Sequence, residues 1–224
     1  NAFRVTGLPV DAATRDVARH ADKLRMLEEL DQGPGALPIA FALQPPPTRD
    51  QVREAIQKLK DPEQRIIDEF FWFWPEEFGQ SRADPAIQAL LSGDSDTAQR
   101  IWAAKESNPQ EGPIAMHNMA VLWHLTALEQ ELISAPTDLD GAGRERLAEA
   151  WRKAFTRWEK LTEDDPFWDQ VSVRIRQLDD PRLSTGFARR MRGSLPEALD
   201  KINAELALDY AERGNLELAR IHVQ

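Results

Sequence analysis

Apolar residues recur at intervals of three and four along most of this chain, which is the spacing of one buried face of an α-helix. In the segment 12–30 the repeat is carried by Val17, Ala21, Leu24 and Leu27. The alternation of apolar and polar residues that is typical of a half-exposed strand is scarce. The pattern therefore predicts an all-α fold.

Capping residues, glycines and prolines place the ends of the predicted helices. Thr48 and Gln51 have the spacing of a capping box, so we expect a helix to begin after Thr48 and to run to Leu59. The glycine- and proline-rich segment 31–48 separates it from the preceding helix. After a connector at 76–84, further helices are predicted at 86–92, 95–106, 113–133, 143–162, 167–178, 183–192, 195–212 and 215–224.

The most unusual stretch is FFWFW, which runs from Phe70 to Trp74 and is followed by Pro75. We expect it to continue the preceding helix. Five successive aromatic residues on a helix surround its axis, so such a helix must be covered on several sides. The favoured interpretation is packing between two helical modules, residues 1–76 and 77–224. The alternative is an exposed surface on which Trp72 and Trp74 contact a partner.

Composition and charge narrow the classes of function. Hydrophobic residues make up 42% of the 224 positions, which favours a folded globule. The net charge of −10 disfavours a nucleic-acid partner, because phosphate binding relies on clustered cations. The absence of cysteine excludes disulfides and thiolate metal sites and fits a cytoplasmic location. No apolar run approaches the roughly 20 residues of a membrane span. Because the chain begins with Asn1, we expect that a preceding segment has been removed.

Few residue patterns point to specific chemistry. His117 and His124 are seven positions apart and share a helical face, but zinc needs three or four ligands and no further ligand is suitably spaced. The densest basic cluster, Arg189, Arg190 and Arg192, is either a solvated helix face or a docking patch for an acidic peptide. No phosphate-binding loop, dinucleotide fingerprint or nucleophile elbow is present. The sequence thus predicts no catalytic residue, metal or cofactor.

Two stretches near the N-terminus, AFRVTGLPVDAATRDVARHADKL and VREAIQKLKDPEQRIIDEF, carry the pattern of a known module. Residues 2–74 resemble a J-domain, which implies a small helical fold. J-domains stimulate Hsp70 ATPases through a His-Pro-Asp tripeptide, and the corresponding loop at 31–48 contains none. The resemblance therefore implies the fold without Hsp70 stimulation. The residues that match are Phe3, Val5, Gly7, Leu8, Pro9, Val10, Leu59, Asp61, Pro62, Arg65 and Asp68.

The last stretch, NAELALDYAERGNLELARIHVQ, has small residues where paired helices cross and larger ones between them. It resembles a tetratricopeptide repeat, with matches at Leu206, Ala207, Tyr210, Gly214, Ala219 and Val223. The segment 86–109 resembles a weaker copy, and 113–162 an irregular one. Repeats need neighbours that cover their faces, so we expect more of them beyond Gln224.

These observations favour a non-enzymatic scaffold or adaptor that binds another protein, in chaperone-associated machinery. The predicted contact residues are Arg189, Arg190, Arg192, Trp72 and Trp74. Two alternatives stay open. The chain is either an enzyme or ligand-binding helical bundle with a site near the two histidines of 113–133, or the regulatory half of a longer protein.

Overall fold

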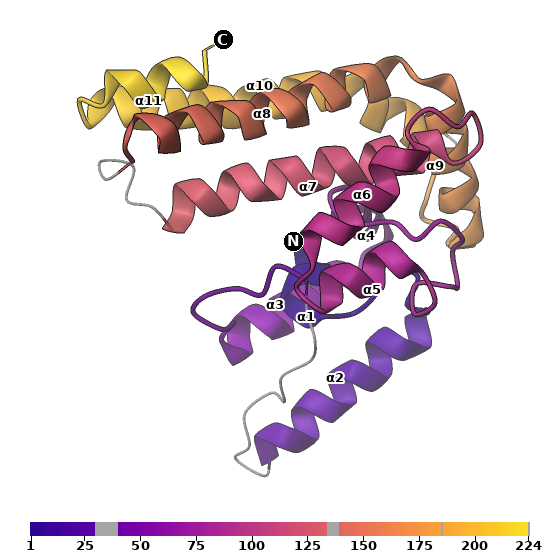
Figure 1. Ribbon diagram of the computed structural model, residues 1–224. Coiled ribbons are helices and arrows are strands. Elements are labelled where there is room, and N and C mark those ends of the chain that lie inside the picture. Colours follow the sequence, from indigo (N-terminus) through magenta and orange to yellow (C-terminus); the bar gives the residue numbers. More distant parts are fainter. Residues whose placement is uncertain (30–39, 134–138, 185, 224) are drawn as a thin grey trace. The chain divides into compact units, whose positions relative to one another are not determined.

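The computed structural model describes residues 1–29, 40–133, 139–184 and 186–223, and these residues form helices and no strands (Figure 1). The all-α fold is therefore confirmed. The helices are α1 (Ala2–Thr6), α2 (Thr14–Glu29), α3 (Arg49–Lys60), α4 (Pro62–Phe70), α5 (Pro85–Leu91), α6 (Ser95–Lys105), α7 (Gly112–Ile133), α8 (Gly141–Glu163), α9 (Asp165–Gln177), α10 (Phe187–Glu212) and α11 (Leu216–Ile221).

The contacts divide the chain into two compact units, and each unit is built from separate stretches of sequence. The first comprises 1–118 and 174–183, and the second comprises 119–173 and 184–224. Helices α7 and α9 each contribute residues to both units. The boundary predicted between residues 76 and 77 falls inside the first unit.

Helix α4 ends at Phe70, so the prediction that the aromatic run continues a helix is wrong. The Trp72 N–H donates to the Glu69 carbonyl over 3.1 Å, which closes a tight turn in place of the next helical turn. Trp74 precedes a proline and is therefore disfavoured in a helical conformation. Its N–H and C=O instead pair with the side chain of Asn118, over 2.8 and 2.7 Å.

The aromatic run lies in the core of the first unit. The Trp72 and Trp74 side chains are only 7% and 2% exposed, and Phe73 stacks on Trp102 with 5.5 Å between ring centroids. Phe73 also stacks on Phe41 at 5.9 Å. Trp72 packs beside Phe73 with 5.3 Å between ring centroids, and Trp74 lies against Phe78 at 5.2 Å. Trp72, Phe73 and Trp74 are therefore buried within the first unit, and Phe71 is half-buried.

Local side-chain chemistry sets most of the helix ends. Thr48 and Gln51 form the predicted capping box at the start of α3. Two helical hairpins, α5–α6 and α10–α11, turn in the same way. In each, a glycine with positive φ, Gly93 at 83° or Gly214 at 77°, precedes a capping side chain, Asp94 or Asn215. Glycine is favoured there because a Cβ would clash with the backbone.

Helix α10 continues through Pro196, so the predicted break between residues 192 and 195 is wrong. A proline removes one backbone N–H and strains the preceding turn. Leu195 and Leu199 are one turn apart on the same face and both are buried, at 4% and 6% exposure. Their burial stabilises the continuous helix against that local loss.

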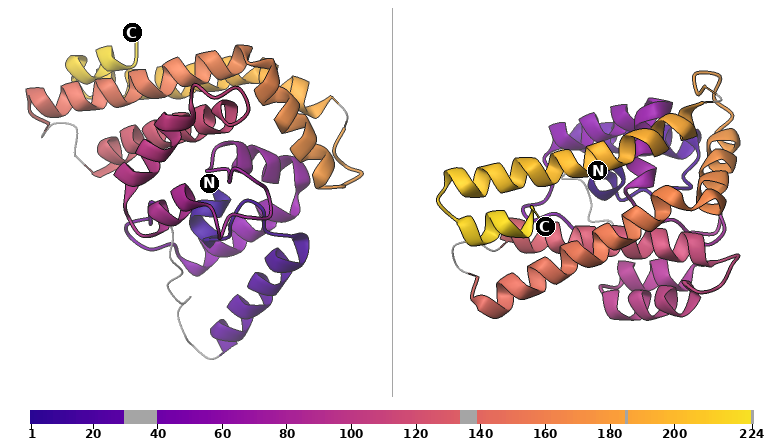
Figure 2. Two further views of the ribbon diagram at one scale, coloured as in Figure 1. Left: turned by 45° about the vertical axis from the view of Figure 1, so that its right-hand side comes forward. Right: turned by 90° about the horizontal axis from the view of Figure 1, so that it is seen from above.

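The core of the second unit joins residues from α7, α8, α10 and α11. Its buried members are Ala127, Leu147, Ala150, Trp151, Tyr210, Leu218 and Ala219. Figure 2 shows α10 and α11 lying side by side as a hairpin. This hairpin and helix α8 frame the candidate site.

Candidate functional site

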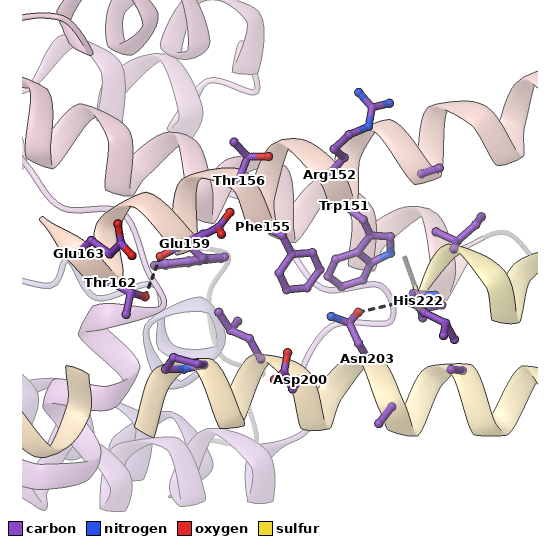
Figure 3. A pocket seen from close by; sticks show the side chains of 18 residues that line it. Trp151, Arg152, Phe155, Thr156, Glu159, Thr162, Glu163, Asp200, Asn203 and His222 are labelled. Atoms are coloured by element: carbon purple, nitrogen blue, oxygen red, sulfur yellow. Dashed lines mark hydrogen bonds between the residues drawn. The ribbon is translucent and has the colours of Figure 1, made fainter. Parts of the chain in front are cut away.

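A large groove lies in the second unit between α8 and the α10–α11 hairpin. Its volume is about 930 Å³, near the top of the range of roughly 300–1,000 Å³ that is usual for ligand sites. Figure 3 shows Trp151 and Phe155 pointing from α8 toward α10, while Asp200 and Asn203 point back from α10. We call this space the α8–α10 groove.

The floor of the α8–α10 groove is apolar and aromatic. Trp151 and Phe155 stack with 5.4 Å between ring centroids and 16° between ring planes. Leu199 and Pro196 line the opposite side, together with the small residue Ala204. Spacing of one helical turn brings Trp151 and Phe155 to the same face of α8, which accounts for their stacking. This floor offers contact area to an apolar or aromatic side chain.

The rim of the α8–α10 groove is acidic. Glu159, Glu163 and Asp200 line it and are exposed. Among the residues that the structure describes, no cation lies within ion-pair distance of these carboxylates. The one lining arginine, Arg152, pairs with Glu149 on its own helix. The groove therefore carries an excess of negative charge at its edge.

A buried polar cluster closes the groove at α11. The His222 Nε2 lies 2.7 Å from the Glu131 Oε1, and its Nδ1 lies 3.2 Å from the Asn203 Oδ1. Trp151 donates its indole N–H to the same Glu131 oxygen over 2.9 Å. Burial raises the pKa of Tyr210, and the nearby Glu131 carboxylate raises it further. The cluster thus ties α7, α8, α10 and α11 together beside the groove.

His117 and His124 belong to different units and each has its own structural role. His117 donates its Nε2–H to the Phe70 carbonyl over 2.7 Å in the first unit. His124 accepts the Trp158 indole N–H at its Nδ1 over 3.2 Å in the second. Burial lowers the pKa of each imidazole to about 4. Both rings are neutral near pH 7. Within the described residues no group of three or more histidine and acidic side chains could hold a metal ion.

The predicted arginine patch is not one free surface. Arg192 donates to the Thr162 carbonyl over 2.7 Å and to Asp165 over 2.6 Å. Arg190 donates to the Ser184 hydroxyl over 2.8 Å. Arg189 is exposed. Arg192 therefore holds α10 to the end of α8 and the start of α9, which reduces the charge available to an acidic peptide.

The first unit contains a buried ion cluster that sequence reasoning missed. Both oxygens of Glu69, which is 0% exposed, accept hydrogen bonds from Arg174 over 2.8 and 2.9 Å, and Arg65 adds a third at 2.9 Å. The two arginines also donate to the Val10 carbonyl. Glu69 and Arg174 are 105 positions apart, so no local pattern could connect them.

Comparison with known proteins assigns no family to this chain. No family model matches the chain, and neither a curated protein nor a solved structure matches it. Among the described helices, none is both long and apolar enough to cross a bilayer. The site itself must therefore carry the functional interpretation.

Proposed function

We propose that this protein is a non-enzymatic adaptor that binds a segment of a partner protein in the α8–α10 groove. The observation that supports this proposal best is the groove itself, with a volume of about 930 Å³ and a stacked aromatic floor formed by Trp151 and Phe155. Grooves between long helices commonly receive the apolar face of a peptide. Aromatic residues are also enriched at the energetic centres of protein interfaces.

The polar groups beside the groove favour binding over reaction chemistry. The imidazole of His222 is buried between Glu131 and Asn203, so its ring nitrogens face protein groups rather than a substrate. A general base needs a free nitrogen within reach of its substrate. The alternative site near His117 and His124 has less support, because both imidazoles are buried and the two residues belong to different units.

The two family resemblances remain interpretations of the sequence and enter the proposal as such. A J-like first module without the tripeptide and repeat-like helical hairpins both suit an adaptor in chaperone-associated machinery. Measurement of Hsp70 ATP turnover with and without the protein tests this part. We expect no stimulation, and a clear increase would contradict it.

A peptide-display selection tests whether the groove binds protein segments. Random peptides would be selected on the immobilised full chain and their affinities measured for Ala204→Trp and Ala211→Trp. Both alanines are exposed on α10, but only Ala204 lines the groove. We expect Ala204→Trp to weaken binding about tenfold or more, since a bulky side chain fills the site, and Ala211→Trp to leave it unchanged. Equal affinities for the two variants, or no selected peptide, would overturn the proposal.

A further inference from the structure

We propose that the occupant of the α8–α10 groove is a basic amphipathic helix of a partner protein. This inference rests on the proposed function and adds the chemistry of the partner to it. It depends on the charge of the rim, the shape of the floor and the kind of backbone that the second unit can accept.

The negative charge of the rim favours a partner that carries positively charged side chains. Glu159 and Glu163 stand one helical turn apart on α8, and Asp200 faces them from α10. All three carboxylates are exposed, and Arg152 is already paired with Glu149. A partner that carries Lys or Arg along both edges of its apolar face would meet carboxylates on both walls. Complementary charge of this kind speeds association and selects among partners.

The apolar floor favours a partner with a stripe of apolar side chains between its positively charged ones. Phe155 is half-buried, so part of its ring is open to the groove, while Trp151 and Leu199 form the deeper floor. An amphipathic helix presents apolar side chains at intervals of three and four, which form a narrow stripe along one face. One or two large side chains of that stripe would cover the exposed part of Phe155.

The helices that form the walls of the groove indicate which backbone conformation of the partner fits between them. The groove is lined by helices, and the described residues of the second unit form no strand, so no sheet edge is available to pair with an extended peptide. Peptides that add a strand depend on such an edge, whereas helices in grooves bind through side chains alone. A helical occupant is therefore the mode that fits this site.

Three labelled peptides of about 18 residues test the inference. They share one apolar stripe at helical spacing and carry Lys, Gln or Glu at the flanking positions. Affinities for the full chain are measured by fluorescence anisotropy at about 0.05 and 0.5 M salt. We expect the Lys peptide to bind about tenfold more tightly than the Gln peptide at low salt and to lose most of this advantage at high salt. The Glu peptide should bind most weakly.

Matched variants of the protein test whether the acidic rim causes the preference for the Lys peptide. Glu159→Lys should weaken the Lys peptide about threefold to tenfold and strengthen the Glu peptide. Glu145→Lys, an exposed change on the same helix away from the groove, should alter neither. Circular dichroism confirms that both variants keep their helix content.

The outcomes separate this inference from the proposed function. If the Lys and Gln peptides bound with equal affinity and Ala204→Trp abolished the binding of both, the proposal of a basic partner would be overturned. The groove would remain a peptide-binding site. An equal loss of Lys-peptide binding in Glu159→Lys and Glu145→Lys would also overturn it, because the rim would then not be the source of the attraction. Binding that is insensitive to Ala204→Trp would overturn both proposals.

Discussion

Two buried carboxylates, one in each unit, are stabilised in different ways. Glu69 in the first unit is surrounded by two arginines and both of its oxygens accept hydrogen bonds from them. Glu131 in the second unit accepts the Trp151 indole N–H at its Oε1, which also lies 2.7 Å from the His222 Nε2, and it interacts with Tyr210. Glu69 is thus held by two guanidinium groups, whereas Glu131 is held by the indole of Trp151 and the imidazole of His222, neither of which is a permanent cation.

The two buried carboxylates have different surroundings and different structural roles. A carboxylate between two guanidinium groups cannot be removed without leaving cations in the interior, so it locks the segments that meet there. The carboxylate of Glu131 is held by Trp151 and His222, which line the α8–α10 groove. The first arrangement links distant parts of the chain, and the second supports one wall of the groove that we propose as a binding site.

The largest expected effect is that of Glu69→Gln. Loss of the charge leaves Arg65 and Arg174 buried without their carboxylate, which should lower the free energy of unfolding by about 3–5 kcal/mol. Urea titration followed by tryptophan fluorescence measures this loss. The control is Glu77→Gln, an exposed change in the same unit that should have almost no effect. If the two variants were equally stable, the ion cluster would not hold the first unit together.

Acid should weaken both units through their buried histidines. Burial lowers the pKa of His117 and His124 to about 4, from an ordinary value of 6.5. Between these values the unfolded chain binds protons that the folded chain does not, so the free energy of unfolding falls as the pH decreases from about 6.5 to about 4. The loss should reach about 3 kcal/mol for each histidine.

Urea midpoints at pH 7 and pH 4.5 check this dependence. His124→Gln keeps an oxygen that can accept the Trp158 N–H but cannot be protonated in this range, so its midpoint should shift less with pH than that of the unmodified protein. An identical pH dependence in both proteins would show that His124 does not contribute.

Glu131→Gln should have a smaller effect than Glu69→Gln. The amide keeps an oxygen for the Trp151 N–H, and no permanent cation is left unpaired in the cluster, so we expect a loss of about 1–3 kcal/mol. Comparison of the two variants by the same urea titration tests the contrast between the units directly. A loss as large as that of Glu69→Gln would contradict it.

The smallest effect should come from the capping box. Thr48→Ala removes the hydroxyl that accepts the Gln51 N–H, at a cost of about 1 kcal/mol in the first unit. Thr156→Ala is the control, because that exposed threonine lies in the middle of α8 and caps nothing. Thermal unfolding by circular dichroism resolves the difference. A Thr48→Ala variant as stable as the control would show that α3 does not depend on its cap.

Helix ends that depend on nearby side chains could be predicted from the sequence. Thr48 with Gln51, and the turns that contain Gly93 and Gly214, are local signals that act over a few positions. The end of α4 could not be predicted in this way. It depends on Asn118, which binds both backbone groups of Trp74 from 44 positions away. Long-range pairing of this kind leaves no trace in local periodicity.

The groove and its polar cluster could not be predicted from the pattern of apolar and polar residues either. No local pattern in the sequence brings Trp151, Phe155 and His222 together. Their meeting with Glu131 and Asn203 depends on how four helices pack, which the spacing of apolar residues does not specify. The basic cluster at Arg189–Arg192 was visible, but its partners on α8 and α9 were not.

The interleaving of the two units has a consequence for biosynthesis. Glu69 emerges from the ribosome well before Arg174, because the whole stretch 119–173 of the second unit is translated between them. The nascent first unit therefore carries a carboxylate that lacks one of its two guanidinium groups until α9 has been made. We expect its final consolidation to wait until Arg174 has left the ribosome, and a ribosome stalled before codon 174 to display a first unit that proteases cleave more readily.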